Sequence, residues 1–260
     1  MIKQRVIFRD LGQEDYKSAW NYQECLLKEN VGKKSLMYAQ HPADSPEPVV
    51  NEGSLTTKNS GLGTGNSEQK TQNYLLLVEH PPVFTLGKSG NINNVLLSEE
   101  RLKERGIEFF RTNRGGDITF HGPQQIVGYP ILDLEKFDTD IGHYLRNLEE
   151  VVILTLSDYG IKAGRSKGET GVWIDPDVKG RERKICAIGV RCSRWITMHG
   201  FAFNVNTDLS YFNYIIPCGI QNKQVTSLQK ELGKQMDFKE AKEKVKRNFE
   251  KVFDVELING

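Results

Sequence analysis

The sequence RGGDITFHGP occupies residues 114–123 and lies between two apolar runs typical of β-strands, residues 107–111 and 126–134. Its two adjacent glycines allow positive φ angles and let another group approach the main chain closely. A glycine-rich loop of this kind can offer backbone N–H groups to a ligand. We therefore expect strands on either side of a loop that lines a binding site.

Two further clusters of small residues follow in the second half of the chain. Residues 198–202 are Met-His-Gly-Phe-Ala, and a single cysteine, Cys218, lies between Pro217 and Gly219. Glycine and proline at such positions favour tight turns. Together with residues 114–123, these clusters indicate one site assembled from segments that are distant in the sequence.

Length and charge restrict the kinds of protein that this chain can be. A chain of 260 residues is at the upper end for one domain, and it can bury both a core and an internal pocket. Its formal net charge of +1 produces no strong field that would attract nucleic acid or anionic lipid. We therefore expect a single domain over residues 1–260, with no nucleic-acid partner.

The apolar runs are too short for a secretion signal or a membrane span, so a cytoplasmic protein without a membrane partner is expected. Thiols in that compartment stay reduced. The four cysteines, Cys25, Cys186, Cys192 and Cys218, show no Cys-x-x-Cys spacing. This spacing argues against a zinc site and against a redox dithiol, so no metal is predicted.

The hydrophobic pattern predicts an α+β fold in which a mixed β-sheet packs with helices. Residues 74–79 are almost all apolar, which is typical of a central strand buried on both faces. Residues 184–191 and 194–205 are predicted as two further strands, joined by a tight hairpin at Cys192-Ser193. Because most neighbouring strands are joined by short turns, a mixed sheet is favoured over a doubly wound parallel one.

Helical spacing of apolar residues occurs at residues 15–28, 141–156 and 237–253. After the first of these, at about residues 33–72, the composition becomes polar and rich in Pro and Gly, without sustained periodicity. Such a composition buries too little apolar surface to fold by itself. We therefore predict a flexible insertion at about residues 33–72 within the single domain.

Cys218 and Lys184 are the strongest candidates for catalysis. A free cysteine has a pKa of about 8.5 and is mostly thiol at neutral pH, so a nucleophilic cysteine needs a nearby cation or base. Lys184 opens an apolar strand, and its ammonium would favour a neighbouring thiolate in a dry pocket. Cys186 lies two residues further along and is a rival nucleophile, although its apolar neighbours favour a core thiol.

His121 and His199 each precede a glycine, and either can be a general base, a hydrogen-bond donor or a structural histidine. With Cys218 they would form a Cys/His arrangement of the protease type, whereas their spacing matches no compact zinc motif. Residues 187–189 and 200–202 are small or apolar. A slot lined by such residues suits an acyl chain better than a sugar or a nucleotide.

These motifs, taken together, resemble the octanoyltransferases of lipoate biosynthesis, also called lipoyl(octanoyl) transferases. Any one motif alone is weak, but the set is highly specific and spans roughly residues 74–230 in the family's order. The matching segments are residues 79–87 (EHPPVFTLG), 114–123 (RGGDITFHGP), 129–134 (YPILDL), 171–173 (GVW), 184–189 (KICAIG), 197–204 (TMHGFAFN) and 217–219 (PCG).

The resemblance implies the α+β fold of the biotin and lipoate protein ligase catalytic domains. It implies transfer of an octanoyl group from octanoyl-acyl carrier protein to a lysine of lipoyl domains, with lipoyl-carrier protein as a further donor. The implied acceptors are the lipoyl domains of 2-oxoacid dehydrogenases and the H protein of glycine cleavage. No cofactor is expected, because a thioester donor is already activated.

By the same resemblance, Cys218 falls on the family's acyl-thioester cysteine and Lys184 on the lysine that tunes it. The substrate-binding residues are expected in three segments of the sequence. They are Arg114, Gly115, Gly116, Asp117, Ile118, Thr119, Phe120 and His121, then Ala187, Ile188 and Gly189, and finally His199, Gly200, Phe201 and Ala202.

Two features depart from the family pattern. Gln124 stands where the family usually has glycine, and the polar insertion is longer than usual. Three alternatives stay open: an ATP-dependent lipoate or biotin ligase of the same fold, a non-catalytic protein that binds acyl groups or lipoyl domains, and, as the most distant, a cysteine protease. A ligase passes through an acyl-adenylate and needs magnesium and a phosphate-binding lysine, so Cys218 together with Lys184 favours the transferase.

Overall fold

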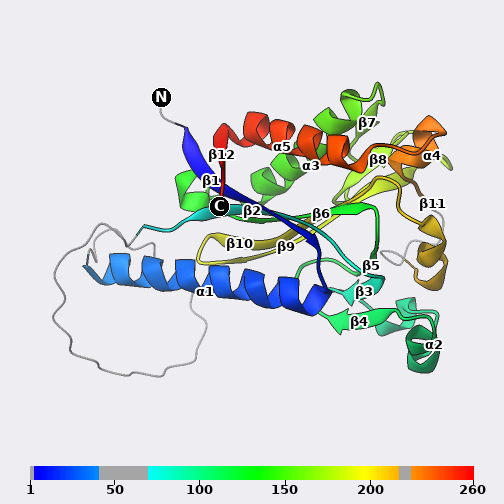
Figure 1. Ribbon diagram of the computed structural model, residues 1–260, viewed down its shortest axis with the longest axis horizontal. Coiled ribbons are helices and arrows are strands. Elements are labelled where there is room, and N and C mark those ends of the chain that lie inside the picture. Colours follow the sequence, from blue (N-terminus) through cyan, green and yellow to red (C-terminus); the bar gives the residue numbers. More distant parts are fainter. Residues whose placement is uncertain (1–2, 41–69, 217–223) are drawn as a thin grey trace.

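A computed structural model describes residues 3–40, 70–216 and 224–260, and within them a large mixed sheet carries helices on both faces (Figure 1). In sheet order its described strands are β12 (Val255–Asn259), β1 (Gln4–Gln13), β2 (Asn73–Glu79), β6 (Gln125–Ile131), β10 (Ile196–Asn204), β9 (Arg183–Ser193), β8 (Val172–Ile174) and β7 (Ala163–Gly164). β1 is parallel to both neighbours, whereas the pairs from β2–β6 to β7–β8 are antiparallel. The predicted mixed sheet is confirmed.

Two shorter strand groups complete the architecture around the ends of β6 and β9. β3 (Val83–Leu86) pairs in parallel with β4 (Glu108–Arg111) and antiparallel with β5 (Ile118–His121). β11 (Gln224–Val225) pairs in parallel with β9 and sets Val225 opposite Lys184. The short helical elements are α2 (Glu99–Glu104), α4 (Leu228–Leu232) and the 3₁₀ helices η2 (Ile92–Asn94), η3 (Leu134–Lys136) and η4 (Leu209–Tyr214).

Strand β2 is buried on both faces, as its continuous apolar sequence predicts. Leu75 and Leu77 belong to the core under α3 (Ile141–Ser157) and α5 (Phe238–Phe253), whereas Leu76 and Val78 belong to the core under α1 (Tyr16–Gln40). Figure 1 shows α1 along one face of the sheet and α3 with α5 on the other. None of the described helices combines the length and apolar composition that crossing a lipid bilayer requires.

The predicted start of the insertion at residue 33 is wrong, because α1 continues to Gln40. Lys34 is 1% exposed, and its ammonium lies 2.6 Å from Asp133 Oδ1 and 2.9 Å from Glu135 Oε2. Thr71 donates to the other oxygen of Asp133 at 2.6 Å, so it too belongs to the folded part. A lysine buried by ion pairs leaves no apolar periodicity in the sequence. Residues 41–69 of the predicted insertion lie outside the described residues.

The predicted hairpin turn at Cys192-Ser193 is also displaced. Both residues belong to β9 and pair with β10, and the chain turns at Arg194 and Trp195, whose φ angles are 49° and 62°. Two consecutive positive φ angles are characteristic of a two-residue hairpin turn, which usually contains Asn or Gly. Because neither is present here, the sequence gives no local signal for the turn.

Candidate active site

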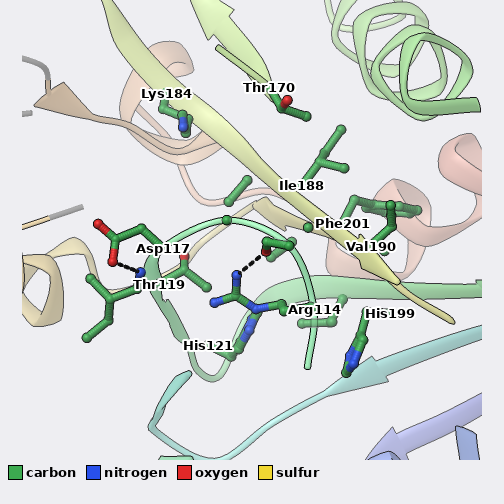
Figure 2. Close-up of a pocket in the computed structure, with 18 of the residues that line it drawn as sticks. Arg114, Asp117, Thr119, His121, Thr170, Lys184, Ile188, Val190, His199 and Phe201 are labelled. Atoms are coloured by element: carbon green, nitrogen blue, oxygen red, sulfur yellow. Dashed lines mark hydrogen bonds between the residues drawn. The ribbon is translucent and has the colours of Figure 1, made fainter. Parts of the chain in front are cut away.

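A cavity of about 680 Å³ lies between the glycine-rich loop and β9, and this size is typical of small-ligand sites (Figure 2). Lys184 and nearly all the predicted substrate-binding residues line it. These are Arg114, Gly115, Gly116, Asp117, Ile118, Thr119 and His121 of the first segment, Ala187, Ile188 and Gly189 of the second, and His199, Gly200, Phe201 and Ala202 of the third. The fold thus brings three distant segments to one space.

Phe120 is the described member of the predicted set that does not line the cavity. Its ring stacks on Tyr211 at a centroid distance of 4.6 Å and packs edge-on against Phe84 and Phe212. Neighbouring side chains of a strand point to opposite faces, and Thr119 and His121 on either side of Phe120 do line the cavity. Phe120 therefore belongs to the core of the smaller sheet.

The glycine-rich loop docks directly on β9. The N–H of Gly115 donates to the carbonyl of Val190 at 2.8 Å. A Cβ atom at Gly189 would lie 2.8 Å from the carbonyl oxygen of Gly115, and one at Gly87 would lie 2.2 Å from that of Gly116. Glycine is thus required here for close backbone approach. At Gly115 the expected ligand-facing N–H is instead used to hold the loop in place.

Arg114 anchors this loop from inside the protein. Its Nη2 donates to the carbonyl and the hydroxyl of Thr85 at 2.6 and 2.9 Å, and its Nη1 donates to the carbonyl of Gly115 at 2.9 Å. The side chain is largely buried. The guanidinium therefore fixes the loop against β3 and places a positive charge at the cavity wall.

Asp117 ties the far end of the loop to the preceding segment. One carboxylate oxygen accepts from the N–H groups of Ile118 and Asn91 at 2.7 and 3.2 Å, and the other accepts from Asn94 Nδ2 at 2.6 Å. Asp117 thus supports the loop and contributes a negative charge to the cavity that it lines.

His121 and His199 are both neutral buried groups. His121 contacts Gln125 Oε1 through Nδ1 at 3.0 Å, and His199 contacts Asn113 Oδ1 through Nε2 at 2.9 Å. Burial, followed by neighbouring positive groups that include Arg114, lowers the pKa of His121 well below its ordinary value and that of His199 to about 3. Such weak bases are poorly matched to general-base catalysis near neutral pH. Their geometry favours hydrogen-bonding roles over a protease-type dyad.

Lys184 stands at the other end of the cavity from His199 (Figure 2). Its Nζ lies 4.6 Å from the centre of the Trp173 ring. The pairing of β8 with β9 shifts register between Val172 and Trp173. Cys186, by contrast, is fully buried in the main core, and burial raises the pKa of its thiol above the ordinary value. The rival nucleophile is therefore a core thiol.

Cys218 lies outside the described residues. The described chain before it ends at Ile216, whose N–H donates to the carbonyl of Asn94 at 2.8 Å, and resumes at Gln224. Phe212 before the cysteine and Val225 after it both line the cavity. The described chain therefore contributes to the cavity on both sides of Cys218 in the sequence.

Sequence reasoning missed several residues of the cavity wall. They are Tyr16, Ser89, Gln125, Val127, Tyr129, Leu145, Gly168, Glu169, Thr170, Val190, Asn204, Phe212 and Val225. Three signals were available: Tyr129 lies in the YPILDL segment, Asn204 ends the TMHGFAFN segment, and Thr170 directly precedes the GVW segment. Tyr16 offered none, because it reaches His121 from α1, with ring centroids 5.9 Å apart.

Acidic, cysteine and histidine side chains are not arranged as a metal site in residues 3–40, 70–216 and 224–260: no three of them come together there as potential ligands. The charges that line the cavity within those ranges come from Arg114, Asp117, Glu169 and Lys184. Its apolar wall includes Val127, Leu145, Ile188, Val190 and Phe201. The arrangement suits an apolar chain with a polar or reactive group at one end.

A family model and the sequences of known proteins match this chain over most of its length. The model of the lipoyl protein ligase A/B catalytic domain matches residues 62–250. The octanoyltransferase of Christiangramia forsetii is 53% identical over 257 residues, covering 98% of this chain and 99% of that protein. The octanoyltransferase of Flavobacterium johnsoniae is 50% identical over 258 residues, covering 99% and 100%.

Solved structures agree on the fold. A bi-partite lipoate protein ligase from Thermoplasma acidophilum superposes with a TM-score of 0.63, covering 100% of this chain and 87% of that chain. Its sequence identity is 15%, so this likeness concerns the fold alone.

Proposed function

The chain belongs to the lipoyl protein ligase A/B catalytic-domain family and is an octanoyltransferase of lipoate biosynthesis, and we propose that it works through a thioester on Cys218. The donor is octanoyl-acyl carrier protein, with lipoyl-carrier protein as a further donor. The acceptors are lysines of the lipoyl domains of 2-oxoacid dehydrogenases and of the glycine cleavage H protein. The enzyme is cytoplasmic and requires no cofactor.

The position of Lys184 carries this proposal. Its side chain lines the cavity, and its backbone pairs with Val225, which follows Cys218 by seven residues. Phe212, six residues before Cys218, lines the same cavity. A segment of six or seven residues reaches at most about 20–25 Å. The cysteine therefore belongs to a short connection between two parts of the cavity wall.

A lysine ammonium near Cys218 supports the first chemical step. The ammonium stabilises the thiolate, which attacks the carbonyl carbon of the donor thioester. A new carbon–sulfur bond to Cys218 forms, and the bond to the carrier sulfur breaks as the carrier thiolate leaves. In the second step the neutral amine of the acceptor lysine attacks, an amide forms and the Cys218 thiolate is released.

The apolar wall of the cavity supports an acyl substrate. Ile188, Val190 and Phe201 line it together with Val127 and Leu145. Each buried methylene of a chain contributes about 0.8 kcal/mol. A fatty chain therefore gains binding energy from this wall, while the reactive thioester lies toward Lys184.

The test is the intact mass of the protein after incubation with octanoyl-acyl carrier protein. We expect the added mass of one octanoyl group, removable by hydroxylamine, and its loss in Cys218→Ala. Cys25 is an exposed free thiol, so Cys25→Ala is the matched control and should keep the adduct. An adduct that persists in Cys218→Ala, or that never forms, contradicts the thioester proposal.

Two further assays separate the alternatives. ATP-dependent transfer from free octanoate would indicate a ligase, and carrier-protein binding without turnover would indicate a binding protein. Lys184→Ala should raise the pH at which the Cys218 thiol is alkylated, because the variant lacks the stabilising cation. An unchanged pH profile would remove Lys184 from the mechanism.

A further inference from the structure

The indole of Trp173 and the ammonium of Lys184 form a close pair on neighbouring strands. The Lys184 Nζ atom lies 4.6 Å from the ring centroid, and Trp173 is 2% exposed. The two residues are also direct cross-strand partners in the β8–β9 register. A cation within about 6 Å of a ring centroid is attracted by the ring quadrupole, most strongly when the pair is desolvated.

Gly171 lies beside the stem of Lys184. A Cβ atom at Gly171 would lie 3.6 Å from Lys184 Cε and 2.5 Å from the carbonyl oxygen of Cys186. Gly171 has a φ of +120°, and its N–H donates to Glu149 Oε1 at 2.9 Å. Backbone without a side chain thus lies beside the lysine stem, while Trp173 lies under its charged end.

We propose that Trp173 is a positioning residue that holds the Lys184 ammonium at the cavity wall. The proposal rests on the proposed role of Lys184 beside Cys218. An aromatic face attracts the ammonium and not the neutral amine. The ring thereby fixes the position from which the Lys184 ammonium acts on the Cys218 thiolate.

Other charged groups near Lys184 do not replace Trp173 as the group that positions the ammonium. Asp117 and Glu169 line the same cavity, and Glu149 lies behind Gly171, where it is engaged with Arg146 and Arg165. These carboxylates attract the ammonium as well. The ring differs from them because it orients the ammonium without neutralising it.

The experiment uses tryptophans that carry increasing numbers of fluorine atoms, incorporated only at position 173. Fluorine withdraws electron density from the ring face and weakens cation binding with little change in shape. The readout is the pH profile of Cys218 alkylation by iodoacetamide, resolved by mass spectrometry. We expect the logarithm of the alkylation rate at pH 7 to fall linearly as fluorination lowers the cation affinity of the ring.

Substitutions by natural amino acids extend the range of cation affinity at position 173. Trp173→Leu should lower the rate at pH 7 by about threefold to tenfold, because leucine keeps an apolar side chain but offers no aromatic face to the ammonium. Trp173→Phe, which keeps a weaker aromatic face, should lie between Leu and Trp. The same fluorinated series at Trp195, which lies in the β9–β10 turn, should leave the profile unchanged.

The Lys184→Ala background separates the two proposals. In that background the fluorinated series at position 173 should have no effect, because the ring has lost its cation. If Lys184→Ala shifts the profile but fluorination of Trp173 in the parent enzyme does not, the inference fails and the proposed function stands. If Lys184→Ala itself leaves the profile unchanged, the role of Lys184 in the proposed function fails, and the inference fails with it.

Discussion

The carboxylate of Glu149 accepts a hydrogen bond from the backbone N–H of Gly171 at 2.9 Å, which joins α3 to the segment before β8. The same fully buried carboxylate binds Arg165 Nε at 2.9 Å. Residues 168–170 lie between these two attachments and line the cavity. A helix on one face of the sheet therefore determines where the wall beside Lys184 lies.

Replacing Glu149 by Gln should destabilise the enzyme and slow octanoyl transfer. The amide keeps one acceptor but removes the charge that holds Arg165 and Arg146, and breaking a buried pair in this way should cost about 1–3 kcal/mol. Urea unfolding measures the stability, and octanoyl transfer to a lipoyl domain measures the activity.

The matched control for that variant is Glu150→Gln. Glu150 binds the same Arg165 at 2.7 Å but is 38% exposed, so its pair is worth less than about 1 kcal/mol. Equal losses in the two variants would show that burial of Glu149 does not matter.

Gly87→Ala should displace the glycine-rich loop. Its new methyl group would lie 2.2 Å from the carbonyl oxygen of Gly116, and such overpacking should cost about 1–3 kcal/mol and raise KM for the donor. Gly32→Ala is the control, because it lies within α1 with no atom within 4 Å. That change should stabilise the protein by about 0.5–1 kcal/mol. A Gly87→Ala enzyme with parental KM and stability would contradict the docking geometry.

Lys34→Met should reveal the buried ion pair at the end of α1. The substitution leaves the carboxylate of Asp133 buried without its ammonium partner, at an expected cost of about 3 kcal/mol. Lys33 is the neighbouring control, because its pair with Glu29 is the ordinary i,i+4 type on the helix surface. Lys33→Met should cost less than about 0.5 kcal/mol. Urea midpoints that rank the two variants in the opposite order would contradict this assignment.

Acid should destabilise the enzyme through its buried histidines. Burial lowers the pKa of His80 to about 4 and that of His199 to about 3. Unfolding restores values of about 6.5, so the unfolded chain binds more protons, and stability is lost as the pH falls from 6.5 towards these folded values. Each histidine should contribute a loss of about 2 kcal/mol between pH 7 and pH 5.

The comparison is the free energy of unfolding in urea at the two pH values. In the described part of the chain, His80→Gln removes one of three buried histidines with a lowered pKa, the other two being His121 and His199, and should reduce the pH dependence by about one third of the combined loss. Equal stability of the parent protein at pH 7 and pH 5 would show that these histidines are not buried as described.

Local features of the sequence predict several elements because their physical cause is local. The consecutive apolar residues of β2 indicate burial on both faces, and Asp237 caps α5 by accepting from Lys239 and Glu240 N–H groups. The hairpin at Arg194-Trp195 was missed because its positive φ angles are imposed by strand pairing on residues without a turn preference.

By itself the sequence determined the mixed α+β class, the family and most of the segments that form the cavity. These follow from composition, periodicity and motif order, which are properties of the chain read in one direction. Only the tertiary structure decided that Phe120 belongs to the core, that Lys34 is buried, and that Trp173 lies beneath Lys184. The first two facts depend on contacts between segments far apart in the chain, and the third depends on the register in which β8 pairs with β9. Such contacts leave no periodic pattern in either segment.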